Sequence, residues 1–198
     1  MKILAISTSP RTGGNTDLLV DEIVRSAREE PDTEVEKVAL KDFNIHACVE
    51  CDLCYHTGDC AINDDMVSMY AKLLDADRIV FATPVFFLGP CAQAKVFIDR
   101  CQALWARKYR KGERLLGRTF PDRRLGYLVS TGGTRGKRLF ECTQRTLRNL
   151  FETIEVMYDG DLLYRQIDDK AAIIKHPTAM GDAYEFGKKI SRKFNWNG

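Results

Sequence analysis

The chain has 198 residues, of which 44% are hydrophobic and 29% are charged, the ordinary balance of a protein with one sizeable core. Its net charge of +2 favours neither nucleic acid nor an anionic membrane as a partner. No run approaches the roughly 20 apolar residues of a membrane helix, and the start "MKILAISTSPRTGGNT" is not typical of a signal peptide. We therefore expect a cytoplasmic protein. In that reducing compartment, clustered cysteines bind metal or do redox chemistry more often than they form structural disulfides.

Short apolar runs alternate with helical patterns along the chain. The continuous apolar run at 3–6 predicts a strand that is covered on both faces, whereas 34–40 is more polar and predicts a strand nearer a sheet edge. Further strands are predicted at 78–83, 125–131 and 154–165. Helices are predicted at 19–27, 66–74, 92–109, 138–151 and 179–194.

This alternation of five strands with five helices predicts an α/β fold for residues 1–198 as a single domain. Its parallel sheet is doubly wound, with right-handed crossovers and helices on both faces. A cysteine-rich segment at about 44–65 interrupts the pattern. Ligands of such sheets bind beyond the carboxyl ends of the strands, so the informative loops follow Ile6, Phe81 and Val129.

The first of these loops, "STSPRTGGNT" (7–16), opens a helix. Main-chain N–H groups at a helix N-terminus favour an anion, and the hydroxyls of Ser7, Thr8, Ser9 and Thr16, the amide of Asn15 and the cation of Arg11 add to them. The alternative is a plain N-cap and tight turn. The loop lacks the glycine patterns of dinucleotide folds and P-loops, so a monophosphate such as that of FMN fits it better.

Two later loops suit a flat ring. "TPVFFLGP" (83–90) places a rigid aromatic segment at the end of a strand, although Phe86 and Phe87 are equally compatible with the core. "TGGTRGK" (131–137) imitates a P-loop, but Thr131 stands where its first glycine belongs. The backbone of Gly132 and Gly133 is better used beside a ring.

Four cysteines follow the spacing Cys48-x2-Cys51-x2-Cys54-x5-Cys60. This rhythm is typical of bacterial ferredoxin clusters, and with no second cysteine set Cys60 would close the same [4Fe–4S] cluster. Zinc, reversible disulfides and inert thiols remain alternatives. We interpret His46 and His56 as ordinary loop residues, and Cys91, Cys101 and Cys142 as small hydrophobes that pack on helices.

These motifs together resemble the iron–sulfur flavoproteins of the NAD(P)H-dependent FMN reductase group, within the flavodoxin-like superfamily. The resemblance spans nearly the whole chain and weakens after about residue 150. The matching segments are "SPRTGGNT" (9–16), "CVECDLCYHTGDCAINDDM" (48–66), "ATPVFFLGP" (82–90), "KVFIDR" (95–100) and the Gly-Gly after the fourth strand.

The resemblance implies a flavodoxin-like sheet of strand order 2-1-3-4-5, FMN, one [4Fe–4S] cluster, and a homodimer or homotetramer in which the cluster of one subunit lies near the flavin of a neighbour. Relatives that lack the full cysteine set work as plain flavin or quinone reductases, whereas all four cysteines are present here. Carried over, the phosphate residues would be Ser9, Arg11, Asn15 and Thr16. The flavin would be framed by Pro84, Val85, Phe86, Phe87, Thr131, Gly132 and Gly133.

The sequence thus predicts a redox protein that moves electrons between a one-electron donor, such as ferredoxin, and a small acceptor, with its chemistry carried by the cofactors rather than by a catalytic side chain. The alternatives are an NAD(P)H-dependent FMN or quinone reductase without a functional cluster, and a non-enzymatic carrier like flavodoxin. The Lys- and Arg-rich segment 105–124 is a solvated loop with a basic helix end, or a dock for an acidic electron carrier.

Overall fold

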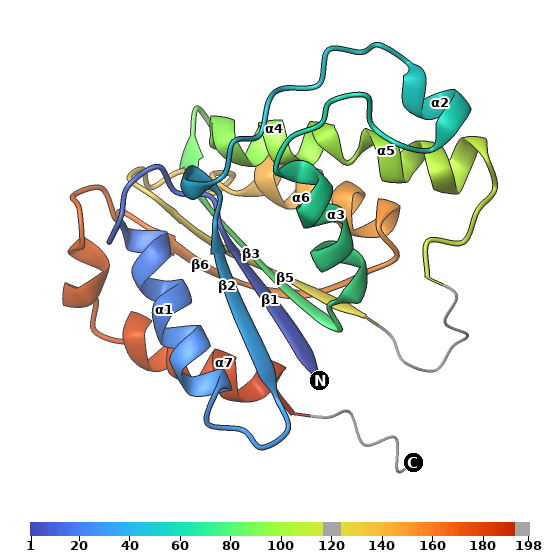
Figure 1. The fold of residues 1–198 in the computed structure, drawn as a ribbon. Helices are drawn as coiled ribbons and strands as arrows, with labels where there is room; N and C mark the ends of the chain where they lie inside the picture. Colours follow the sequence, from blue (N-terminus) through green and yellow to red (C-terminus); the bar gives the residue numbers. More distant parts are fainter. Residues whose placement is uncertain (117–123, 193–198) are drawn as a thin grey trace.

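The computed structural model describes residues 1–116 and 124–192 (Figure 1). At its centre lies a parallel sheet with the strand order β2-β1-β3-β5-β6, and the short β4 pairs with the end of β3 in the antiparallel sense. The predicted order 2-1-3-4-5 is confirmed, with β4 as an addition. The described strands are β1 (Lys2–Ser7), β2 (Glu34–Ala39), β3 (Arg78–Phe86), β4 (Gly89–Pro90), β5 (Leu125–Gly132) and β6 (Met157–Arg165).

Helices cover both faces of this sheet (Figure 1). One face carries α1 (Asn15–Ala27) and α7 (Ala179–Ile190), and the other carries α3 (Met66–Asp75) and α6 (Glu141–Thr153), with α4 and α5 beside them. Each layer encloses its own cluster of buried apolar side chains. The remaining helical segments are α2 (Leu53–Thr57), α4 (Ala92–Arg100), α5 (Gln102–Trp105), η1 (Leu40–Asp42), η2 (Ala106–Arg110) and η3 (Ala172–Lys175).

The burial of the strands follows the apolar pattern of the sequence. β5 is buried at every position and β1 at all but its first, because helices cover both faces of these inner strands. β2 lies at the edge of the sheet and alternates between exposed and half-buried positions until Val38, as its polar sequence predicts. The carboxyl ends of β1, β3 and β5 therefore lie side by side, with Ser7 paired to Ala82 and Pro84 to Thr131.

Several predicted boundaries shift. The predicted helix 92–109 is interrupted at Cys101 and continues as α5 and a π-helical turn, η2. The last helix ends at Ile190, and the predicted residues 193–194 lie outside the described range. β6 begins at Met157 rather than 154, because Glu155 adopts a left-handed φ of 59° after α6. Among the described helices, none has the length and apolar character needed to cross a membrane.

Candidate functional site

The loop between β1 and α1 is shaped by a buried carboxylate, Asp17. Asp17 accepts hydrogen bonds from the hydroxyl of Ser7 at 3.0 Å and from the main-chain N–H of Gly13 at 2.9 Å. Lys37 Nζ lies 2.7 Å from the same carboxylate. Burial disfavours the charged form of Asp17, but the bonds from Lys37, Gly13 and Ser7 outweigh it and lower the pKa of Asp17. Gly13 takes a left-handed φ of 65°, which suits glycine.

The far side of the same loop is open to a ligand. Gly14 caps α1 without any side-chain hydrogen bond, so the first N–H groups of the helix have no capping side chain. Ser9 Oγ accepts the main-chain N–H of Arg11 at 3.2 Å and folds the loop back over Gly14. A Cβ added at Gly14 would lie 3.0 Å from that oxygen, so a side chain would fit there only tightly. This arrangement favours an anion.

A cavity of about 110 Å³, which we call the loop cavity, lies at this edge of the sheet. The predicted phosphate and ring residues all line it except Ser7, Thr8 and Phe87. Three loops therefore converge, as the carboxyl-end rule predicts. Its lining comprises Ser9, Pro10, Arg11, Gly14, Asn15, Thr16, Pro84, Val85, Phe86, Thr131, Gly132, Gly133, Ile167, Asp168 and Lys170.

The segment after β6 also reaches the loop cavity, which sequence reasoning missed. Asn15, predicted as a phosphate ligand, holds this segment: its amide donates to the carbonyl of Asp169 at 2.9 Å and accepts from the N–H of Ile173 at 3.1 Å. Lys170 is brought over the first loop, where its Cε would lie 4.0 Å from a Cβ at Gly13. The segment "IDDK" (167–170) follows the last strand at the carboxyl edge, and that position is the signal that could have pointed to it.

The turn after β3 projects into solvent. Phe86 is 47% exposed, Phe87 is fully exposed, and Phe87 and Leu88 have left-handed φ values of 49° and 64°. The interpretation of Phe86 and Phe87 as core residues is therefore wrong. Across the cavity, a Cβ at Gly132 would lie 2.9 Å from Leu139 Cδ2, and one at Gly133 would lie 2.9 Å from Asp168 Oδ1. The Gly-Gly ledge therefore has no room for a side chain.

A buried polar network supports these loops from beneath. Cys91 donates its thiol to the carbonyl of Thr8 at 3.1 Å and its N–H to Thr83 Oγ1 at 3.1 Å, and Ser130 Oγ donates to the carbonyl of Thr83 at 2.6 Å. Cys91 and Cys101 are buried, as predicted. Cys142 is exposed at the start of α6, so its predicted packing as a small hydrophobe is wrong.

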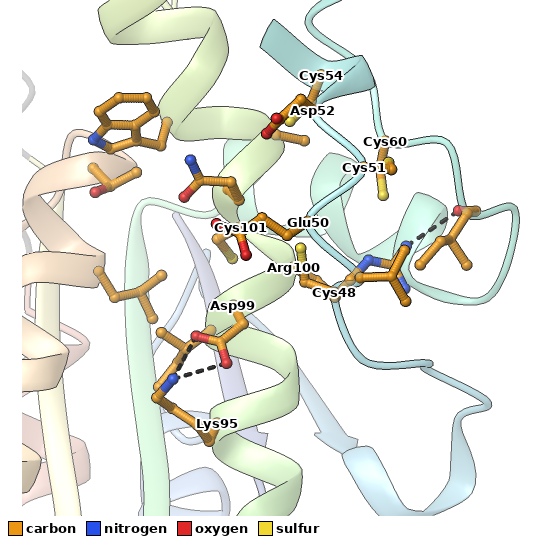
Figure 2. A pocket seen from close by; sticks show the side chains of 18 of the residues that line it. Cys48, Glu50, Cys51, Asp52, Cys54, Cys60, Lys95, Asp99, Arg100 and Cys101 are labelled. Carbon is orange, nitrogen blue, oxygen red and sulfur yellow. Dashed lines mark hydrogen bonds and ion pairs between the residues drawn. The ribbon is translucent and has the colours of Figure 1, made fainter.

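The four clustered cysteines line a second, larger cavity of about 800 Å³, which we call the cysteine cavity (Figure 2). The segment 48–62 forms one wall, the end of α4 with α5 forms another, and α6 forms the third. All four cysteines are free thiols. Neither His46 nor His56 lines this cavity. His46 lies in a loop, as interpreted, whereas His56 belongs to α2 and not to a loop.

The backbone of the cysteine segment has an unusual conformation. Glu50 and Asp52, which flank Cys51, have left-handed φ values of 53° and 58°, in a region that few residues other than glycine adopt. Among the described residues, none of the main-chain N–H groups of 49–53 has a hydrogen-bond acceptor. Left-handed residues that leave successive N–H groups free form the concave sites found at phosphates and iron–sulfur centres.

The four thiols lie within electrostatic range of one another. Burial raises the pKa of the Cys54 thiol, and charges on Cys60, Cys48 and Cys51 raise it further. Within residues 1–116 and 124–192, no group of three or more His, Cys, Asp or Glu side chains converges closely enough to hold a single metal ion. A [4Fe–4S] cluster asks for a wider set, because each thiolate binds a different iron atom. Four thiols around one cavity therefore fit a cluster better than one zinc ion.

Part of the basic segment 105–124 packs against the cysteine segment. Arg110 lies over the ring of Tyr55 at 5.0 Å, and Lys111 Nζ donates to the carbonyl of Thr57 at 3.4 Å. The prediction that the whole segment is a solvated loop or a dock is wrong for Arg124, which is buried and donates to the carbonyls of Leu73, Ala76 and Ile154. Residues 117–123 lie outside the described range.

Comparison with known proteins identifies the family. Residues 1–159 match the sequence pattern of the family described as NADPH-dependent FMN reductase. The chain belongs to this family. The predicted resemblance is thereby confirmed at the level of the family.

Iron–sulfur flavoproteins are among the similar sequences. One from Methanocaldococcus jannaschii is 40% identical over 104 residues, which are 52% of this chain and 53% of that protein. A second from the same organism is 30% identical over 163 residues, covering 81% of this chain and 75% of the relative. The chain spans between about half and two thirds of the length of the first curated relatives that it matches.

Solved structures share the fold. An FMN-dependent NADH-azoreductase of Bacillus anthracis, solved with FMN, superposes with a TM-score of 0.67 over 97% of this chain and 100% of that one. Its sequence identity is 11%, so the likeness concerns the fold alone.

Proposed function

We propose that the protein is a flavin-dependent oxidoreductase, an iron–sulfur flavoprotein that binds FMN at the loop cavity and a [4Fe–4S] cluster at the cysteine cavity. The observation that carries this proposal is the cysteine segment itself. Four free thiols line one cavity on a backbone whose left-handed residues leave N–H groups without protein acceptors. The family membership and the iron–sulfur flavoproteins among the relatives support both cofactors.

FMN would enter the loop cavity with its phosphate against the start of α1. Ser9, Thr16 and the first N–H groups of the helix donate to it, while Arg11 and Lys170 supply positive charge. The cavity of about 110 Å³ is too small for the whole nucleotide, since sites for ligands of that size span roughly 300 Å³ or more. The ring would then lie beside Gly132 and Gly133, toward the exposed turn at Phe86.

The cluster would be held by Cys48, Cys51, Cys54 and Cys60. A cluster exchanges one electron at a time and a flavin one or two, so the pair links one-electron donors to two-electron acceptors. The chain's own part would be to hold the thiols and to offer free N–H groups to the sulfurs. Thiol ligands that stay reduced suit the cytoplasm.

An acidic, ferredoxin-like donor would dock beside the cysteines. Arg110, Lys111 and Arg114 are exposed, and the first two pack against α2 within the cysteine segment. A negatively charged carrier that binds there places its own redox centre near the thiols. Attraction of this kind mainly sets the association rate and is screened by salt.

Electron flow between the two sites would involve a second copy of the chain. The loop cavity and the cysteine cavity have no lining residue in common. The family resemblance implies a homodimer or homotetramer in which the cluster of one subunit faces the flavin of another. Each copy would act as one domain over residues 1–198 that carries both half-sites.

The second candidate is an NAD(P)H-dependent FMN or quinone reductase without a functional cluster, which the description of the family itself favours. Anaerobically purified protein decides between the two. The proposed function expects flavin that co-migrates with FMN on release, about four iron and four sulfide per chain, and flavin bleaching with reduced ferredoxin. If the protein binds FMN without iron or sulfide, and NADPH alone bleaches the flavin, the result would support the NAD(P)H-dependent reductase instead. If the flavin bleaches but no small acceptor is turned over, the result would support a non-enzymatic electron carrier.

A further inference from the structure

A buried arginine stands behind the cysteine segment. Arg100, the last residue of α4, has a fully buried side chain and forms a two-pronged ion pair with Asp64, whose side chain is 2% exposed. The guanidinium and carboxylate meet at N–O distances of 2.6 and 3.1 Å. Charges this deeply buried persist only when they are paired and hydrogen-bonded, so Arg100 and Asp64 each require the other as a partner.

The same guanidinium ties both ends of the cysteine segment. Arg100 donates to the carbonyl of His46 at 2.9 Å and to the carbonyl of Ile62 at 3.1 Å. His46 lies two residues before Cys48, and Ile62 lies two residues after Cys60. Because one rigid planar group holds both carbonyls, the chain from 46 to 62 is closed into a loop at its base.

One donor of this guanidinium remains. Arginine has five N–H bonds, and the four terminal ones point to Asp64, His46 and Ile62. The fifth, on Nε, is buried and has no acceptor among the described residues. Arg100 lines the cysteine cavity together with all four cysteines (Figure 2). A buried donor without a partner is uncommon in folded proteins, so it points to a missing acceptor.

We propose that Arg100 is a positioning residue for the sulfur ligands of the cysteine cavity, which closes the cysteine loop and donates its Nε–H to a sulfur of the bound cluster. This inference rests on the proposed function. A fixed positive charge and a hydrogen bond at the sulfurs stabilise the reduced, more negative cluster. Arg100 therefore both retains the cluster and raises its reduction potential.

The test uses Arg100→Lys, which keeps the charge but loses the planar fork and Nε. The matched control is Lys188→Gln, an ion-paired lysine on α7 that lines neither cavity and contacts Glu29 and Glu30. We expect Arg100→Lys to retain FMN, to lose iron to a chelator 10–100-fold faster, and to show a more negative cluster potential in an EPR-monitored titration. In the cluster-free protein, its four cysteines should react faster with an alkylating reagent. Lys188→Gln should change none of these.

A double variant, Arg100→Met with Asp64→Leu, removes both charges of the buried pair, and its FMN content reports whether the fold survives. It should keep FMN and lose iron quickly. Either variant with FMN bound and with wild-type iron retention and potential would overturn the role of Arg100 alone. Loss of FMN from both variants would also overturn it, because Arg100 would then be merely structural. Wild-type protein without iron or sulfide would overturn the cluster function and this inference with it.

Discussion

Replacing Asp17 with Asn tests whether one buried carboxylate fixes the first loop. The Asp17 side chain is 10% exposed and lies 2.7 Å from Lys37 Nζ. Removing one partner of a fully buried ion pair costs about 3–5 kcal/mol, but Lys37 keeps Asp21 as a partner and the Asn oxygen still accepts one bond. The expected cost of Asp17→Asn is therefore one charge-assisted hydrogen bond, about 2 kcal/mol of unfolding free energy, or about a 30-fold drop in the folded-to-unfolded ratio.

The pH dependence has a definite sign. The pKa of Asp17 is lower in the folded state than in the unfolded state, where it lies near 3.9. Its contribution is therefore fully present above that value and is lost as the pH falls through the folded value. Urea unfolding of the flavin-free protein should show the full gap between wild type and Asp17→Asn at pH 7 and at pH 5.5, and a smaller gap at pH 3.5.

The matched control is Asp21→Asn, which also contacts Lys37, at 2.6 Å, but is 55% exposed. Its cost should stay within about 0.5 kcal/mol, as for other surface pairs. Only Asp17→Asn should also weaken FMN retention, because Asp17 holds the N–H of Gly13 in the phosphate loop. Equal costs for the two variants, or a gap that does not narrow at low pH, would refute the reasoning.

Three further predictions concern the cofactors and the donor. Cys51→Ser should lose iron and sulfide but keep FMN, with Cys142→Ser unchanged, as measured by metal, sulfide and flavin analysis; joint loss of FMN would contradict the separation of the sites. Arg11→Ala and Lys170→Ala should each weaken FMN binding about tenfold, the value of one phosphate contact of roughly 1.4 kcal/mol, in a fluorescence titration. If Lys170→Ala binds FMN with unchanged affinity, Lys170 does not contact the phosphate. Arg110→Glu should slow reduction by ferredoxin in stopped flow, and rising salt should slow the wild type; a salt-independent rate would argue against docking there.

Much of the loop cavity could be predicted from the sequence because its signals are local. Continuous apolar runs mark the inner strands, and the loops that follow them in the chain meet at one edge of a parallel sheet. Ser9, Pro84 and Gly132 lie at or just beyond the carboxyl ends of three separate strands and line one cavity for that reason. The spacing of the cysteines likewise predicted that they gather, because three thiols at every third residue of a loop can curl around one centre.

What could not be predicted depends on contacts between distant parts of the chain. The amide of Asn15 donates one N–H to the carbonyl of Asp169, 154 residues away, a contact that its local motif could not predict. The hydrogen bond between Asn15 and Asp169 also brings the neighbouring Lys170 to the cavity, and no sequence motif marks Lys170. Arg124 stands in a run of basic residues, yet three carbonyls from separate segments surround it. Charge patterns in a sequence cannot separate such a buried cation from its exposed neighbours.

The helix α4 connects the two sites and fixes their separation. Cys91, which precedes its first residue, is hydrogen-bonded to Thr8 and Thr83 beneath the loop cavity, and its last residue, Arg100, holds the base of the cysteine loop. The nine residues of α4 span about 13 Å, and Ala94 and Phe97 are fully buried against the sheet. Because both ends are anchored in buried hydrogen bonds, α4 acts as a rigid spacer. We therefore expect each proposed cofactor site to keep its geometry when the other is empty.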